Sequence, residues 1–239
     1  RGFDEVIVSN GRHFDFDTDP KTDYPKGQYL ADFLTDHAVD FIRQHKDGPF
    51  FLYLPHFGVH APHQAKEELI ARFKNKPAAG GHHDPTYAAM IASVDESVGR
   101  ILALLDELML ADNTVVIFSG VNGGVGGYDR PDGLIRDRGT KSGKDNSADA
   151  ETRSITDNAP LRSGKGSLYE GGTRDPFIVR WPGVTKPGST TGVNAIHVDV
   201  YPTLLDIAQA QPPANQPLDG ESLTPLLRDA GASLRRTAI

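Results

Sequence analysis

The segment from residue 84 to residue 118 constrains the fold of this chain most strongly. It opens with Asp84-Pro85, an N-cap residue followed by proline at the first helical position. Apolar side chains then recur at steps of three and four, as on one helix face: Tyr87, Ile91, Val94, Val98, Ile101, Leu105 and Leu108. The run TVVIF at residues 114–118 has the β-branched character of a buried strand. The segment predicts a long helix that packs on a sheet and leads into a strand.

Shorter patterns repeat this alternation along the chain. Apolar side chains recur at helical spacing in residues 27–48, and residues 64–75 have the pattern of an exposed, polar helix. FFLYL at residues 50–54 is typical of a short, fully buried strand. PFIVRWPG, at residues 176–183, predicts another strand, and DVYPTLLDIA, at residues 199–208, predicts a helix. Strands that alternate with helices favour an α/β fold whose mostly parallel or mixed sheet is flanked by helices.

Composition excludes several classes of function. The net charge of −7 and the pI near 5.7 argue against nucleic-acid binding, which normally requires a basic face. No apolar run approaches the ~20 residues that cross a bilayer. The sequence has no cysteine, so a disulfide, a cysteine–zinc site and a cysteine nucleophile are excluded within it. The first residues also lack the basic and apolar blocks of a signal peptide.

Residues 129–158 differ in composition from their surroundings. Charged residues of both signs are dense there, and large apolar residues are few. A segment of about 30 residues without regular structure is uncommon in a compact domain and is usually functional or disordered. We interpret it as a charged loop insertion, either a determinant of substrate specificity or a disordered segment.

The glycine-crowded loop FSGVNGGVGGY, at residues 118–128, follows the predicted strand at the end where α/β sheets place their ligands. A phosphate cradle is disfavoured, because neither VNGGVGG nor the later RSGKGS fits the spacing of a nucleotide-binding motif. A metal site would normally show a carboxylate in such a loop. Here Val121 stands in that place.

Two further stretches carry candidate site residues. In LYLPHFGVHAPHQ, His56, His60 and His63 directly follow a predicted strand, although any one of them could be an ordinary surface histidine. In APLRSGKGSLYEGG, Arg162 and Lys165 lie among glycines, where a cation can approach an anion closely. A lone Lys-Gly pair is more often a turn, but a patterned block that ends in a core strand is harder to explain that way.

The block APLRSGKGSLYEGGTRDPFIVRWPG resembles the arylsulfatase family of the alkaline-phosphatase superfamily. Other blocks resemble it in family order: GFDE, PFFLYLPHFGVHAPHQAKEELIARF, YAAMIASVDESVGRILALLDEL, NTVVIFSGVNGG, VDVYPTLLDIA and LDGESLTPLL. The resemblance implies an α/β/α sandwich, of which residues 1–239 would be an incomplete catalytic domain.

The resemblance also implies a chemistry. Family members hydrolyse sulfate monoesters with a formylglycine made from a C/S-x-P-S-R motif and with a calcium ion held by Asp and Asn side chains. By position, His60 resembles the histidine that contacts sulfate near the leaving-group oxygen. Lys165 resembles the sulfate-binding lysine, and Asn122 resembles the asparagine of the metal-binding S-D-N-G motif. Cations and a metal aimed at sulfuryl oxygens are what developing negative charge requires.

Three departures from the family pattern bear on activity. The C/S-x-P-S-R motif is absent, and so is the rest of the family's amino-terminal third, with its paired aspartates. The S-D-N-G motif reads Gly120 to Gly123 here, with Val121 at the aspartate position and Asn122 retained. Calcium takes about six to eight oxygen ligands. We therefore expect this chain neither to bind calcium usefully nor to hydrolyse esters, and we expect exposed strand edges to favour pairing with another copy.

Several alternatives stay open at this point. The substrate implied by the resemblance is a sulfated small molecule or glycan, in the periplasm, the extracellular space or the lysosome. A pseudo-sulfatase that binds sulfated glycans without cutting them is the non-enzymatic alternative, and Val121 favours it. A phosphonate or phosphodiester hydrolase of the same superfamily is the enzymatic alternative.

Overall fold

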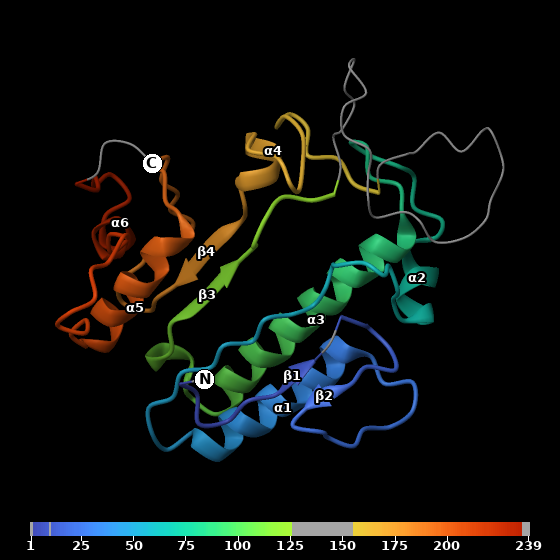
Figure 1. Ribbon diagram of the computed structural model, residues 1–239, viewed down its shortest axis with the longest axis horizontal. Coiled ribbons are helices and arrows are strands. Elements are labelled where there is room, and N and C mark those ends of the chain that lie inside the picture. Colours follow the sequence, from blue (N-terminus) through green and yellow to red (C-terminus); the bar gives the residue numbers. More distant parts are fainter. Residues whose placement is uncertain (1, 10, 126–154, 236–239) are drawn as a thin grey trace. The chain divides into compact units, whose positions relative to one another are not determined.

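The computed structural model describes residues 2–9, 11–125 and 155–235, which form two compact units (Figure 1). The first unit draws on Arg1–Met109 and Gly120–Asp175, and the second on Leu110–Ser119 and Pro176–Ile239. Most of the predicted charged loop, residues 129–154, lies outside the described residues. Among the described helices, none is long and apolar enough to cross a membrane.

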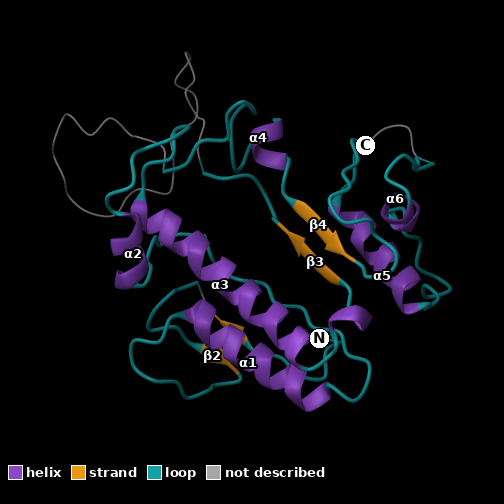
Figure 2. Cartoon of the chain, turned by 180° about the vertical axis from the view of Figure 1, so that it is seen from behind, coloured by secondary structure: helices purple, strands orange, loops and turns teal. Residues whose placement is uncertain are grey.

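The first unit is mainly helical. Its helices are α1 (Leu30–His45), α2 (Glu67–Phe73), α3 (Pro85–Glu107) and the single turn α4 (Glu170–Thr173). The strands β1 (Val8–Ser9) and β2 (Thr18–Asp19) form a short antiparallel ladder. In both views α1 and α3 lie side by side, with α2 against the first turns of α3 (Figures 1 and 2). The three long helices confirm the helical spacing seen in the sequence.

The helix α3 begins at the residue that the sequence predicts. The Asp84 carboxylate accepts a hydrogen bond from the Tyr87 backbone N–H at 2.8 Å, as an N-cap should. The buried face of α3 contains Ala89, Met90, Ser93, Ser97, Leu104 and Leu105. Within the described part of the first unit this face packs on α1 and α2, because its small side chains let neighbouring helices approach closely. Within the apolar stripe, Ile91 is 51% exposed.

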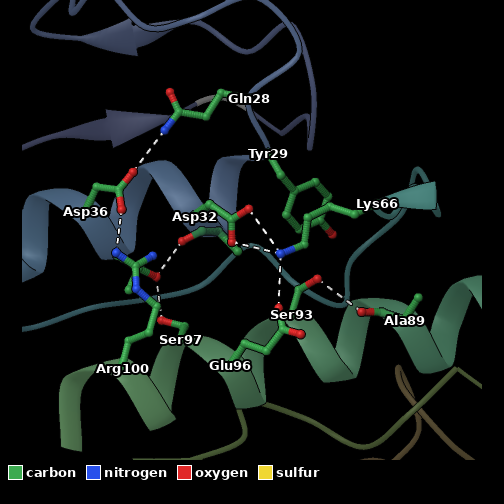
Figure 3. Close-up of polar contacts among 12 residues, drawn as sticks. Gln28, Tyr29, Asp32, Asp36, Lys66, Ala89, Ser93, Glu96, Ser97 and Arg100 are labelled. Atoms are coloured by element: carbon green, nitrogen blue, oxygen red, sulfur yellow. Dashed lines mark hydrogen bonds and ion pairs between the residues drawn. The ribbon is translucent and has the colours of Figure 1, made fainter. Parts of the chain in front are cut away.

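Ion pairs join α1 to α3 at the edge of this helix contact (Figure 3). The Lys66 Nζ lies 3.1 Å from an Asp32 oxygen of α1 and 3.0 Å from an oxygen of Glu96 of α3. Burial lowers the pKa of Lys66, but hydrogen bonds and the charges of Glu96 and Asp32 outweigh it, so the pKa lies above its ordinary value. The exposed Arg100–Asp36 pair adds a second link at 2.6 Å.

A chain of hydroxyl groups crosses the buried centre of the same contact. Thr35 donates to the Ala31 carbonyl at 2.6 Å, and its Oγ1 lies 2.6 Å from the Ser97 Oγ. Ser97 in turn lies 3.0 Å from Nε2 of His56. Because Thr35 donates to Ala31, the consistent arrangement has Ser97 donating to Thr35 and His56 donating to Ser97. The hydroxyl groups of Thr35 and Ser97 and the Nε2 of His56 are therefore hydrogen-bonded in one continuous chain across α1 and α3.

The prediction of a buried strand at residues 50–54 is wrong for the described structure. The segment is extended, with Phe50, Leu52 and Leu54 half-buried and Phe51 and Tyr53 57% and 64% exposed. This alternation is strand-like, but no described segment forms a β-ladder with it. A strand needs a neighbour to take up its backbone hydrogen bonds, and local sequence cannot provide one.

The second unit holds a two-stranded ribbon and two helices. Its elements are η1 (Ala111–Asn113), β3 (Val116–Ser119), β4 (Phe177–Arg180), η2 (His197–Asp199), α5 (Val200–Ala208) and α6 (Thr224–Arg228). Strands β3 and β4 pair antiparallel from Val116↔Arg180 to Ser119↔Phe177 (Figure 2). Both predicted strands and the predicted helix are confirmed. Their antiparallel pairing is compatible with the mixed sheet that the sequence predicts.

Asp199 fixes the start of α5. Its side chain is fully buried and accepts backbone hydrogen bonds from Ile196 at 2.8 Å and Glu221 at 2.9 Å. One turn later the Thr203 hydroxyl donates to the Asp199 carbonyl and accepts from the Leu223 N–H. A carboxylate that accepts two amide hydrogen bonds can stay charged in a buried position. It thereby ties the residue 221–223 segment to α5.

Candidate functional site

The loop that carries Asn122 and the loop that carries Lys165 lie against each other in the first unit. The backbone N–H of Gly123 donates to the Gly172 carbonyl at 3.0 Å, and the N–H of Lys165 donates to the Gly124 carbonyl at 2.9 Å. These two bonds join residues 120–125 to residues 158–173. We call this arrangement the loop pair. The structure therefore brings together two of the three site residues predicted from the sequence.

The glycines of the loop pair are explained by close approach of backbone to backbone. A Cβ added to Gly123 would lie 1.7 Å from the carbonyl oxygen of Gly171. One added to Gly171 would lie 2.0 Å from the Ser163 oxygen, and one added to Gly172 would lie 2.4 Å from the Ser167 oxygen. Only glycine fits such contacts without moving the backbone. The glycine-rich sequence thus serves loop-to-loop packing.

Asn158 adds the side-chain link of the loop pair. Its Nδ2 donates to the Gly124 carbonyl at 3.0 Å and to the Ser163 carbonyl at 3.1 Å. Sequence reasoning did not single out this residue. Its position just before the APLRSGKG block, at the edge of the charged segment, was the available signal.

Lys165 is the cation best placed to receive an anion. Its side chain is half-buried and forms no ion pair with any described residue. The Arg162 guanidinium, the second predicted candidate, lies 3.9 Å from the centroid of the Tyr169 ring, so it is held in a cation–π contact. The two cations of this block therefore differ: one is stacked on an aromatic ring and the other has no charged partner within the described structure.

The loop pair contains the position at which the family motif places its calcium ligands. Val121 is 80% exposed at the position where the family motif has a carboxylate, and Asn122 beside it is exposed. No group of three His, Cys, Asp or Glu side chains that could hold a metal ion occurs among the described residues. Asn122 supplies a single amide oxygen, whereas calcium takes about six to eight oxygen ligands. The described residues of this chain therefore do not provide the ligands that a calcium ion needs.

His60 is held by a histidine that the sequence analysis overlooked. The His60 ring is exposed, its Nδ1 lies 2.7 Å from the Ala61 carbonyl, and its backbone N–H donates to Phe57. The Nε2 of buried His13 donates to the His60 carbonyl at 2.7 Å, and the His13 ring stacks on Tyr29. Burial lowers the pKa of His13 despite this hydrogen bond, so its ring is held as the neutral form that donates from Nε2.

The remaining histidines take different roles. His56 is a packing residue, since its Nε2 contacts Ser97 and burial lowers its pKa. The His63 ring meets Tyr87 edge-on. His82 is exposed, and its Nδ1 lies 2.9 Å from Oγ1 of buried Thr156, beside the loop pair. Among the described contacts, none joins His60 to the loop pair.

Solved structures with this fold define the class. The chain superposes on Ps i-CgsB with a TM-score of 0.70 at 31% identity, covering 90% of this chain and 42% of that one. It matches the PsFucS1 sulfatase from Pseudoalteromonas sp. with a TM-score of 0.67 at 26% identity, covering 90% of this chain and 38% of that one. These matches confirm the α/β class and an incomplete sulfatase domain. The phosphonate monoester hydrolase from Silicibacter pomeroyi, at 20% identity and a TM-score of 0.53, shares the fold alone.

Sequence comparison gives the family. The family model described as Sulfatase matches residues 1–210, and the chain belongs to the sulfatase family. It is 34% identical over 216 residues to a sulfatase of Formosa agariphila, covering 84% of this chain and 34% of that protein. Human arylsulfatase A is 32% identical over 212 residues, covering 89% of this chain and 34% of that protein. The chain thus spans about a third of the length of these relatives.

Proposed function

We propose that this chain supplies the substrate side of a sulfatase site, a sulfuric ester hydrolase in the intact protein. Lys165 binds the sulfate group, His60 approaches the leaving-group oxygen, and Asn122 is what this chain retains of the metal loop. The observation that supports this most directly is Lys165, a half-buried residue that has no ion pair with a described residue and lies on a loop fixed by backbone contacts.

The physical case rests on preorganisation. A cation partly removed from water attracts an anion more strongly than a fully solvated one does, because the effective dielectric is lower. A lysine whose backbone is hydrogen-bonded into the loop pair loses little further backbone freedom on binding. Hydrogen bonds to charged groups are also the stronger kind. A sulfate monoester has three non-bridging oxygens that share its negative charge and can accept such hydrogen bonds.

The polypeptide as given binds sulfate esters without hydrolysing them. Its sequence holds no C/S-x-P-S-R motif, and Val121 stands where a metal-binding carboxylate is expected. This chemistry needs a nucleophile that attacks sulfur and a metal that stabilises the developing charge. A pseudo-sulfatase that binds sulfated glycans is the second candidate, favoured by the same exposed valine.

A glycan is the partner class we favour. Ps i-CgsB, which is 31% identical to this chain over the matched region, has been solved in complex with k-i-k-neocarrahexaose. By the same family analogy the protein works outside the cytoplasm, in a periplasmic, extracellular or lysosomal setting. Fractionation of the source cells would check this location.

The test uses the full 239-residue chain and the variant Lys165→Ala. Calorimetric titration with a sulfated monosaccharide should give binding that its unsulfated parent does not give. Lys165→Ala should weaken that binding by about 10- to 100-fold, the value of a hydrogen bond to a charged group. The exposed Lys186→Ala is the matched control and should bind like the parent chain. Equal affinity for both sugars contradicts the proposed site, and measurable aryl sulfate hydrolysis contradicts the proposed inactivity.

The extended segment at residues 50–54 supports a further proposal about assembly. Its strand-like alternation without a β-ladder leaves an edge on which a second copy of the chain can pair. Sedimentation velocity of the same preparation should then give more than one species. A single monomer across the concentration range would contradict it.

A further inference from the structure

We propose that Asn158 is a positioning residue that sets the Lys165 loop against the Asn122 loop. The inference rests on the proposed function, because it concerns how the sulfate-binding lysine is held. Asn158 itself touches neither the sulfate position nor a reacting atom in this assignment.

The geometry singles out Asn158 because one side-chain nitrogen serves both loops. Its Nδ2 donates to the carbonyl of Gly124 on one loop and to that of Ser163 on the other, at 3.0 Å and 3.1 Å. An amide NH₂ group has two donors, and these two contacts use both of them. No shorter polar side chain could reach two carbonyls in this way.

The Gly124 carbonyl is the point at which the network converges on Lys165. This oxygen accepts from the Asn158 amide and also from the backbone N–H of Lys165, at 2.9 Å. A carbonyl oxygen has two lone pairs, so both bonds can form together. Fixing this one oxygen therefore fixes the backbone of Lys165.

Asn158 is itself anchored on the Lys165 side. Its backbone carbonyl accepts the N–H of Leu161 at 2.8 Å, which closes a turn that leads into the lysine loop. A Cβ on Gly124 would lie 3.0 Å from the Asn158 Oδ1 and 2.9 Å from the Thr156 Cγ2, so the asparagine side chain packs directly on the Asn122 loop. The Gly123–Gly172 and Lys165–Gly124 links are backbone bonds, whereas the link through Asn158 is one that a side-chain mutation can remove.

The first experiment measures the loops without ligand. Hydrogen exchange by NMR should show the Lys165 and Gly123 amides, which bond across the loop pair, exchanging at least about tenfold faster in Asn158→Ala. Amides in the middle of α3 should be unchanged, and exposed Asn75→Ala should leave every rate unchanged. Unchanged exchange at Lys165 and Gly123 overturns the inference. Equal acceleration throughout the chain also overturns it, since that would be general destabilisation.

Asn158→Asp keeps the side-chain shape and provides a second test. The carboxylate of the variant faces two carbonyl oxygens and can donate to neither. Hydrogen exchange at the Lys165 and Gly123 amides should therefore be at least as fast as in Asn158→Ala. A protonated carboxyl can donate one hydrogen bond, so the difference from Asn158→Ala should shrink or reverse as the pH falls. A role through packing alone would give no such pH profile and would overturn the inference.

The ligand arm separates this inference from the proposed function. Asn158→Ala should weaken binding of inorganic sulfate at Lys165 by about 2- to 10-fold, which is smaller than the loss from Lys165→Ala. If the parent chain binds no sulfate while the exchange results hold, the proposed function fails and the positioning of the loops stands. If sulfate binds and Asn158→Ala leaves its affinity unchanged, the positioning role is overturned.

Discussion

The α1–α3 contact and the loop pair belong to the same unit but are held by different chemistry. Side chains hold the helices: a buried hydroxyl chain through Ser97, ion pairs through Lys66, and an apolar face. Backbone groups hold the loops, with glycines in contact and Asn158 as the side-chain link described above. Helix packing can be altered one group at a time, whereas backbone contacts at these distances tolerate no added atom.

The largest effect should come from adding a methyl group inside the loop pair. Gly123→Ala places a Cβ against the Gly171 carbonyl, so the loops must separate, at a cost of about 2–4 kcal/mol. Gly99→Ala is the matched control, because nothing lies within 4 Å of its Cβ position in α3. It should stabilise the helix by up to about 1 kcal/mol. Urea denaturation measures both, and equal effects would remove the distinction between the two regions.

Deleting a hydroxyl from the helix contact should cost less. Ser97→Ala removes the acceptor for Nε2 of His56 and leaves that buried group unsatisfied, at about 1–3 kcal/mol. Ser93→Ala is the control, since the Ser93 hydroxyl donates to Ala89 on the same helix. It should cost clearly less than Ser97→Ala by thermal or urea denaturation. The reverse order would show that the hydroxyl chain does not stabilise the contact.

The smallest effect should be a dependence of stability on pH in the acidic range. Burial lowers the pKa of His56 and His13 below the ordinary 6.5, so below that pH the unfolded chain binds protons that the folded chain does not. The free energy of unfolding should therefore fall as the pH drops through and below 6.5. His56 Nδ1 is buried without a hydrogen-bond partner among the described residues, which strengthens this expectation.

The measurement is the free energy of unfolding against pH for the parent chain and for His56→Gln. The glutamine cannot titrate, so the slope below 6.5 should be shallower even if the variant is less stable overall. Exposed His83→Gln should keep the parent slope. A slope that is unaltered in His56→Gln would mean that this ring is not buried in its neutral form.

The elements that the sequence predicted correctly are those whose signals are local. The Asp84-Pro85 start of α3, the spacing of α1 and the β-branched run of β3 each depend on residues close in the chain. Strand pairing is not local, so residues 50–54 were predicted as a buried strand that the described residues do not pair.

The site divides in the same way. Sequence motifs indicated Lys165, Asn122 and His60, and the structure brings the first two into one loop pair. Their roles in binding stay predictions. His13 and Asn158 were missed because each acts on a residue far away in the chain, across 47 and 34 positions. Only the structure reveals the contacts of His13 and Asn158, because neither residue belongs to a recognised sequence motif.

The exposure of Val121 has a consequence for how this chain can evolve. Because the side chain is 80% exposed and the loop is shaped by glycine backbone contacts, residue 121 contributes little to holding its own loop. Valine and aspartate codons can differ by a single base, so the carboxylate could be gained or lost without disturbing the scaffold. Metal-binding chemistry at residue 121 can therefore change in evolution without a change in the loop backbone, and the change can be reversed.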